Sequence, residues 1–138
     1  MSKRTLIVVL FLLALLSLSS LPTAVSPANG GATRLLRTPT VSATQIAFAY
    51  ANNIWVVERA GGTARRLTNF QEQTSNPHLS PDGKWIAFSG EYAGNTEVYV
   101  VPTAGGEPQR LTWHPGADTV QGWMHEGKAV LFASARAT

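Results

Sequence analysis

Residues 76–118 read NPHLSPDGKWIAFSGEYAGNTEVYVVPTAGGEPQRLTWHPGAD, and they repeat a pattern that the chain has already used in residues 38–70. The motif IAF occurs at 46–48 and again at 86–88, an offset of 40. Three later motifs return at an offset of 44: IWVV at 54–57 as VYVV at 98–101, AGG at 60–62 and 104–106, and RLT at 66–68 and 110–112. A third copy opens at Val120, where GK and VLF (127–132) match GK and IAF (83–88). A period of 40–45 residues with several short strands per copy predicts a β-propeller.

Short runs of β-branched and aromatic residues alternate with turn signals in each copy. In the second copy, WIAFS (85–89) and EVYVV (97–101) are typical of strands. The turn signals between them are PDGK, YAGN and AGGEP, in which Pro restricts φ, Asp bonds its own backbone and Gly allows positive φ. We therefore expect four strands per copy: one before the PDGK turn, then 85–91, 97–103 and 109–113. Helical periodicity is absent after residue 28, so the predicted fold class is all-β.

The repeats predict four-stranded antiparallel blades, with one blade at 38–75, a second at 76–119 and a partial third at 120–138. A single blade cannot bury both of its faces, and propeller rings usually contain about 4–8 blades. About two and a half blades are thus expected to be the N-terminal fragment of a longer propeller protein.

The N-terminus has the order of a secretory signal peptide. Lys3 and Arg4 precede the apolar run LIVVLFLLALL (6–16), and small or helix-breaking residues follow it. A membrane span needs about 20 apolar residues, so retention of this shorter run as a membrane anchor is the less favoured alternative. We predict a signal peptide at 1–28, with cleavage after Ala28 or Ala24, a short linker at 29–37, and an exported, periplasmic or secreted protein.

Charge and cysteine content exclude several functional classes. Beyond Lys3 and Arg4 the chain has nine basic and eight acidic residues, and its widest basic cluster is Arg65-Arg66. A nucleic-acid-binding protein would carry a larger basic patch interleaved with aromatic residues. Because the chain contains no cysteine, disulfides, Cys-ligated zinc and thiol nucleophiles are excluded. We expect neither nucleic acid nor, after signal cleavage, a membrane as a partner.

The motifs LSPDGKWIAF (79–88), VYV (98–100) and GGEPQRLT (105–112) resemble the WD40-like repeat of periplasmic and tricorn-type propellers. A narrower resemblance, carried by RLTWHPGAD (110–118), GW (122–123) and GK (127–128), is to the second-to-third blade junction of bacterial tricorn protease homologues. Two copies depart from the turn pattern: the first has ATQ at 43–45 in place of Pro-Asp-Gly-Lys-Trp, and the third has HEG at 125–127 in place of Pro-Asp-Gly.

The tricorn resemblance implies a serine peptidase in which propellers precede a PDZ-like module and the catalytic domains. In that case this chain is a non-catalytic propeller segment that gates or guides peptide substrates, and it carries no catalytic, cofactor-binding or metal residue. Peptides or proteins would be the partners, and a homo-oligomer of the parent is left open. The alternative is a periplasmic protein-interaction propeller similar to the Tol-system protein, which is not an enzyme. That family has an α/β domain before its propeller, and residues 29–37 leave little room for one. A prolyl-oligopeptidase-like or amidohydrolase-type propeller is a third possibility.

Three groups of residues could carry chemistry, but each fails on its spacing. His125-Glu126 begins an H-E-x-x-H zinc motif, but position 129 is Ala. His78, His114 and His125 lie in separate segments without the local spacing of zinc ligands. Ser80, His78 and Asp82 contain the residue types of a catalytic triad but lack a G-x-S-x-G elbow. We therefore predict no metal site, no cofactor and no catalytic group here.

The paired glycines and the tryptophans are interpreted as structural residues. Gly61-Gly62 and Gly105-Gly106 recur at one place in both copies, so they indicate hairpin turns and not a phosphate loop. Trp55 aligns with Tyr99, and Trp85 lies in a repeated apolar strand, which favours packing between blades. Trp113 and Trp123 lie at strand ends and are the better candidates for a surface role.

Overall fold

A computed structural model describes residues 36–136; the predicted signal peptide and most of the predicted linker lie outside these residues. The described chain forms ten strands and one 3₁₀ turn: β1 (Arg37–Val41), β2 (Gln45–Tyr50), β3 (Asn53–Glu58), β4 (Arg65–Arg66), β5 (Thr74–Leu79), β6 (Trp85–Tyr92), β7 (Asn95–Pro102), β8 (Gln109–Arg110), β9 (Asp118–Met124), η1 (His125–Gly127) and β10 (Ala129–Ser134). No helix in this part of the chain is long and apolar enough to cross a membrane.

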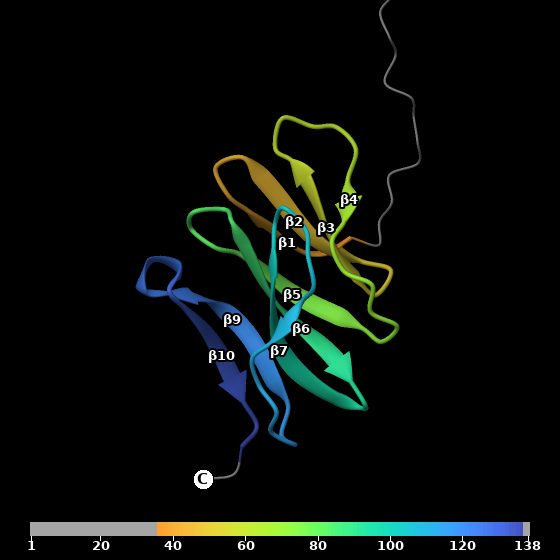
Figure 1. The fold of residues 1–138 in the computed structure, drawn as a ribbon, viewed down its shortest axis with the longest axis vertical. Coiled ribbons are helices and arrows are strands. Elements are labelled where there is room, and N and C mark those ends of the chain that lie inside the picture. Colours follow the sequence, from red (N-terminus) through yellow and green to blue (C-terminus); the bar gives the residue numbers. More distant parts are fainter. Residues whose placement is uncertain (1–35, 137–138) are drawn as a thin grey trace, which may run out of the picture. The chain divides into compact units, whose positions relative to one another are not determined.

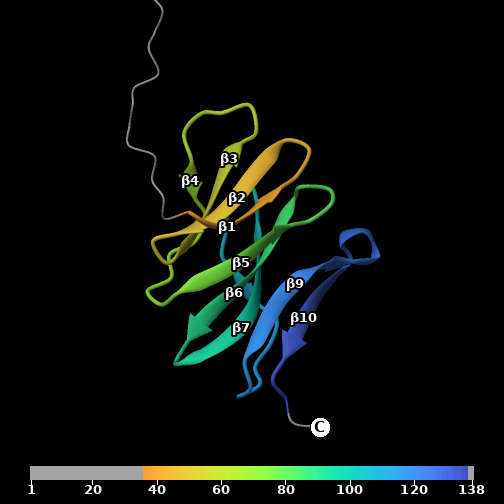
Figure 2. The same ribbon diagram turned by 180° about the vertical axis from the view of Figure 1, so that it is seen from behind.

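The strands form three antiparallel sheets in chain order (Figures 1 and 2). The first two sheets have the strand orders β1-β2-β3-β4 and β5-β6-β7-β8, and β9 pairs with β10 in the third. We call them blades 1, 2 and 3. This arrangement confirms the all-β prediction. One expected strand is much shorter than predicted, because only Gln109 and Arg110 of 109–113 pair with β7.

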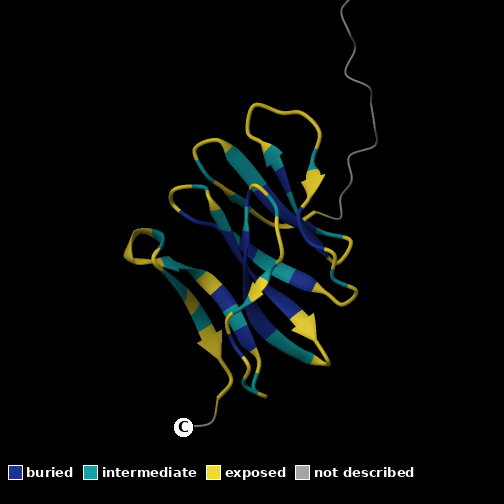
Figure 3. Cartoon of the chain, viewed as in Figure 1, coloured by how far each residue is buried: buried dark blue, intermediate teal, exposed yellow. Residues whose placement is uncertain are grey.

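Two cores lie between successive blades, since strand side chains alternate between the two faces of a sheet. Ile86, Phe88 and Tyr99 of blade 2 are buried against blade 1, on Ala47, Ala49, Ile54 and Val56. The neighbouring positions of the same strands, Ala87, Val98 and Val100, are buried against Val120 of blade 3. Blade 2 is therefore apolar on both faces, and it shows the most continuous buried strands in Figure 3.

Strand register explains why the repeat offset changes from 40 to 44. Phe48 pairs with Trp55 in blade 1, and Phe88 pairs with Tyr99 at the same place in blade 2. The β2–β3 hairpin ends at the pair Tyr50–Asn53, whereas the β6–β7 hairpin continues for two further pairs, to Tyr92–Asn95. Two extra pairs add four residues, which accounts for the larger offset of every later motif.

The hairpin turns require backbone conformations with positive φ. Both central residues of the β2–β3 turn, Ala51 and Asn52, have positive φ, and so do Ala93 and Gly94 of the β6–β7 turn. Two-residue turns of this kind match the twist of the flanking strands. Each blade thus ends its β2–β3 or β6–β7 hairpin in a tight turn, with an alanine held in a conformation that costs it energy.

Candidate functional site

Two hollows open at one end of the strands. The β1–β2, β5–β6 and β9–β10 turns lie together on the left of Figure 1, and the hollows lie at the opposite strand ends. Their walls come from the β2–β3 turn, the β6–β7 turn, the start of β1 and the segment between β4 and β5. Residues from neighbouring repeats therefore meet here, as the blade topology requires.

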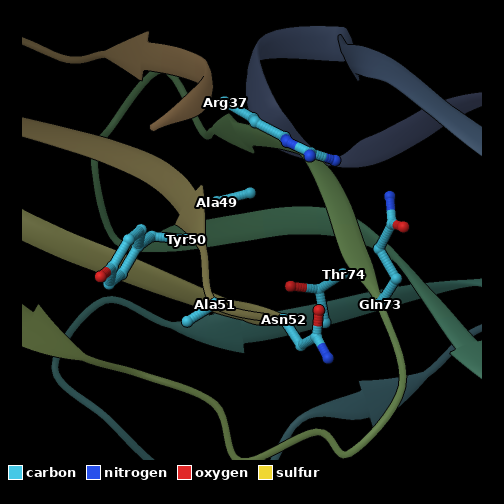
Figure 4. A pocket seen from close by; sticks show the side chains of 7 residues that line it. All are labelled: Arg37, Ala49, Tyr50, Ala51, Asn52, Gln73 and Thr74. Atoms are coloured by element: carbon cyan, nitrogen blue, oxygen red, sulfur yellow. The ribbon is translucent and has the colours of Figure 1, made fainter. Parts of the chain in front are cut away.

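The first hollow, about 320 Å³, lies where blade 1 meets the start of β5, and it is lined by Arg37, Ala49, Tyr50, Ala51, Asn52, Gln73 and Thr74 (Figure 4). In Figure 4 the Arg37 side chain extends across one side, with Gln73, Thr74 and Asn52 around the others. The Tyr50 ring is turned away from these polar groups. The hollow thus combines a cation with a hydroxyl and two amides above small apolar residues.

The second hollow, about 350 Å³, is lined by Asn69, Phe70, Gln71, Glu72, Glu91, Tyr92 and Ala93. Tyr92 is 58% exposed, and the Arg110 guanidinium lies 5.1 Å from the centre of its ring. Among the salt bridges of residues 36–136, none involves Arg37, Glu72 or Glu91. The first hollow therefore carries a cation and the second two carboxylates, all on exposed side chains that form no salt bridge among residues 36–136.

A buried hydrogen-bonded cluster around Thr68, which we call the first clasp, supports the first hollow. The Ile54 amide donates to Thr68 Oγ1 (2.9 Å), and this hydroxyl donates to Asn53 Oδ1 (3.0 Å). The Phe70 amide also donates to Asn53 Oδ1 (2.8 Å), and Asn53 Nδ2 donates to the carbonyl of Ala51 (3.0 Å). The clasp therefore ties the β2–β3 turn to the segment that leads into β5.

The equivalent cluster in blade 2, the second clasp, contains a buried carboxylate. Thr112 accepts from the Val98 amide (3.0 Å) and donates to Glu97, whose Oε1 also accepts from Arg110 Nη2 (2.6 Å) and Asn95 Nδ2 (2.8 Å). Burial alone would raise the pKa of Glu97, but the hydrogen bonds from Thr112, Arg110 and Asn95 outweigh it and hold this pKa below its ordinary value. Glu97 is thus a structural anion that orients the β6–β7 turn.

The three histidines named from the sequence do not meet. His78 lies on β5, and burial lowers its pKa; His114 accepts the Gly116 amide on Nδ1 (2.9 Å). His125 lies in the η1 turn between β9 and β10. Within the described part of the chain, no three His, Asp or Glu side chains are grouped as metal ligands.

The serine candidate belongs to a turn. Ser80 is 1% exposed; its hydroxyl donates to Asp82 Oδ1 (2.6 Å) and accepts from the Trp85 amide (3.0 Å). Among the hydrogen bonds of residues 36–136, none joins the Ser80 hydroxyl to His78, so these three residues do not form the relay of a triad. Their arrangement instead closes the Pro-Asp-Gly turn.

Trp113 and Trp123, both expected at the surface, differ in exposure. Trp113 is 70% exposed, and the Arg110 guanidinium lies 5.8 Å from its ring centre. Trp123 is half-buried against the core between blades 2 and 3, and its Nε1 donates to the carbonyl of His78 (2.8 Å). The expected surface role of Trp123 is therefore wrong, because its strand packs on blade 2. Trp85 packs between blades, as predicted.

Sequence reasoning overlooked Arg37 and Thr74 of the first hollow. Arg37 lies outside the repeated motifs, and Thr74 lies two residues before the second copy of the repeat, which begins at residue 76. One signal was present: Asp118 stands 44 residues after Thr74, also at the start of an inner strand, and its carboxylate pairs with Arg136 at 2.9 Å. A polar residue thus begins the first strand of blade 2, β5, and the first strand of blade 3, β9.

Comparison with known families decides the relationship of this chain. Residues 33–138 match the tricorn protease N-terminal β-propeller domain. The chain belongs to this family. Tricorn protease homolog 1 of Streptomyces coelicolor is 31% identical over 100 residues, which cover 72% of this chain and 9% of that relative. Putative tricorn protease homolog 2 of the same organism is 37% identical over 95 residues, 67% of this chain and 8% of that relative. The chain therefore spans less than a tenth of the length of either tricorn relative.

Solved propeller structures agree with the fold of this tricorn-family chain. TolB from Acinetobacter baumannii has a TM-score of 0.64 and 27% identity, covering 73% of this chain and 27% of TolB. The crystal structure of the tricorn protease has a TM-score of 0.60 and 22% identity, covering 67% of this chain and 10% of that protein. The blade architecture inferred from the repeats is thus the architecture of both.

Proposed function

We propose that this chain is the N-terminal propeller segment of an exported tricorn-like serine peptidase, in which it guides peptides and does not itself catalyse hydrolysis. The match of residues 33–138 to the tricorn N-terminal propeller carries the proposal. Two features add support. The polar hollows lie at one face with opposite charges, which suits an extended peptide. The Ser80 hydroxyl, which was weighed with His78 as part of a triad, is engaged in hydrogen bonds within its turn.

The test measures hydrolysis of a quenched fluorescent peptide library by the full-length protein, with and without a fluorophosphonate that labels activated serines. We expect hydrolysis that the reagent abolishes, and labelling outside residues 36–136. A Ser80→Ala variant should retain full activity, because this hydroxyl is bonded within its turn. A folded protein that neither hydrolyses peptides nor reacts with the probe would contradict the peptidase assignment.

Export is tested separately, by N-terminal sequencing of the mature protein. We expect a start between residues 25 and 30, because Lys3, Arg4 and the apolar run 6–16 have the order of a signal peptide. Recovery of an intact Met1 on cytoplasmic protein would contradict export without affecting the peptidase assay.

A second candidate function is a protein-interaction propeller without catalysis. The observation that favours it is the 27% identity and 0.64 TM-score to TolB from Acinetobacter baumannii. It predicts that the full-length protein binds a folded protein partner yet leaves every peptide of the library intact. The fluorophosphonate experiment therefore separates the two candidates directly.

A further inference from the structure

We propose that the first hollow binds the carboxylate of an aspartate or glutamate side chain in an extended peptide, with Arg37 and Thr74 as its donors. The inference rests on the proposed role in guiding peptides and specifies which side chain this blade junction selects. Arg37 is the first residue of β1 and Thr74 the first of β5, so the fold of two blades is needed to bring them to one hollow.

Arg37 supplies the charge. Its side chain lines the hollow and forms no salt bridge among residues 36–136. Residues 1–35 and 137–138 contain no Asp or Glu. A guanidinium presents planar, paired donors that match the geometry of a carboxylate. A ligand carboxylate would provide the counter-charge that Arg37 does not receive from a salt bridge within residues 36–136.

Thr74 supplies an independent indication that a ligand belongs there. It is only 4% exposed, and its hydroxyl is buried with no hydrogen-bond partner in the described structure. An unpartnered buried hydroxyl is unfavourable, and here it is turned into the hollow beside Ala49 and Ala51 (Figure 4). The backbone of Thr74 pairs with Gly90, so the position of this hydroxyl is set by the sheet.

The two amide side chains of the hollow suit a peptide and not a bare anion. Asn52 Nδ2 donates to the carbonyl of Gln71 (3.2 Å), which leaves its oxygen as an acceptor beside Thr74. Gln73 offers both a donor and an acceptor on the opposite side (Figure 4). A ligand that carries an anionic side chain and peptide N–H and C=O groups would satisfy all of these groups.

The test is calorimetric titration of the full-length protein with two peptides whose ends are blocked, acetyl-AAEAA-amide and acetyl-AAQAA-amide. We expect the Glu peptide to bind about tenfold or more tightly than the Gln peptide, as the loss of a charge-assisted hydrogen bond implies. Arg37→Gln should abolish this preference. Arg66→Gln, which removes the same charge from the exposed strand β4, is the matched control and should preserve it.

Thr74→Val separates binding from folding. This substitution should lower the affinity for the Glu peptide several-fold. The melting temperature should stay unchanged or rise, because a buried polar group without a hydrogen-bond partner is removed. Equal affinity for the two peptides, no binding of either, or a preference that survives Arg37→Gln would overturn the site. So would a preference for a Gln peptide with a free C-terminus, which would assign the hollow to a chain end. Hydrolysis of library peptides without Glu preference would remove this inference and leave the proposed function standing.

Discussion

Blades 1 and 2 have the same strand order and register, yet they close the same buried cluster with different chemistry. Asn53 in the first clasp and Glu97 in the second occupy equivalent positions, and each accepts a hydrogen bond from a threonine 15 residues later. The first clasp is neutral, and Arg66 beside it is exposed on β4. The second clasp is charged, and the equivalent Arg110 forms its ion pair with Glu97 at 2.6 Å.

The difference shows that the threonine hydroxyl is the common element of the repeat, whereas its acceptor can be neutral or charged. A buried carboxylate is tolerated only when donors compensate for its loss of solvent. Blade 2 supplies three donors, Thr112, Arg110 and Asn95. Blade 1 needs fewer donors because the Asn53 side chain is neutral, and its own Nδ2 donates to the carbonyl of Ala51. The second clasp should therefore be the more sensitive to mutation.

The largest expected effect is on the two equivalent arginines. Arg110→Met should destabilise the full-length protein by about 3 kcal/mol, because it leaves the Glu97 carboxylate buried without its cation. Arg66→Met should change stability by less than about 0.5 kcal/mol, as an exposed substitution. Urea unfolding followed by tryptophan fluorescence measures both. Equal effects would mean that the ion pair contributes no more than a surface contact.

Gly90 provides the next test, since Tyr50 occupies its position in blade 1. A Cβ at Gly90 would stand 2.9 Å from Cε1 of Phe70 and 3.1 Å from the Tyr99 ring, so Gly90→Ala should cost about 2 kcal/mol by overpacking. Adding Phe70→Leu should restore part of this loss, because the obstructing ring is then removed. Additive losses in the double variant would show that the two sites are not in contact.

The turns of blade 2 give a smaller difference. Gly83→Val and Gly94→Val should each cost about 1–2 kcal/mol, because both glycines have φ in the left-handed region. Gly83→Val should cost more, because its Cβ would already be in van der Waals contact with the Ser42 hydroxyl oxygen of blade 1 at 3.4 Å and the valine methyl groups extend beyond it, whereas the space around Gly94 is open. Thermal melts rank the two. Because the β6–β7 turn at Gly94 has only two residues, both glycines lie in tight turns and this ranking rests on packing alone.

The smallest expected effect is on pH dependence. The folded-state pKa of Glu97 is below its ordinary 4.5, so its contribution is fully present above that value and is lost as pH falls through the folded pKa. Glu97→Gln should therefore reduce the loss of stability between neutral pH and about pH 3. Asn53→Asp should give the opposite dependence, with stability lost at neutral pH and partly recovered in acid, because a carboxylate there has no arginine partner and its oxygen would face the carbonyl of Ala51. Identical pH profiles for wild type and Glu97→Gln would contradict the assignment of Glu97 as a buried anion.

The repeat alone determined the fold class and the order of the strands. IAF and VYVV recur with turn residues between them, and this local pattern is enough to define strands that must pack on neighbouring copies. The sequence also showed that Ser80, His78 and Asp82 lack the elbow motif of a catalytic triad, and in the structure Ser80 closes a turn. These features depend on residues close together in the chain.

Only the tertiary structure decided where the hollows lie and what they contain. Arg37 and Thr74 are far apart in the sequence and meet because β1 and β5 are the inner strands of adjacent blades. The sequence likewise does not show that Glu97 is buried. The folded sheet places the donors of Arg110, Thr112 and Asn95 around its carboxylate. Sites of this kind arise from packing between repeats, and a pattern within one repeat cannot specify which side chains its neighbours bring.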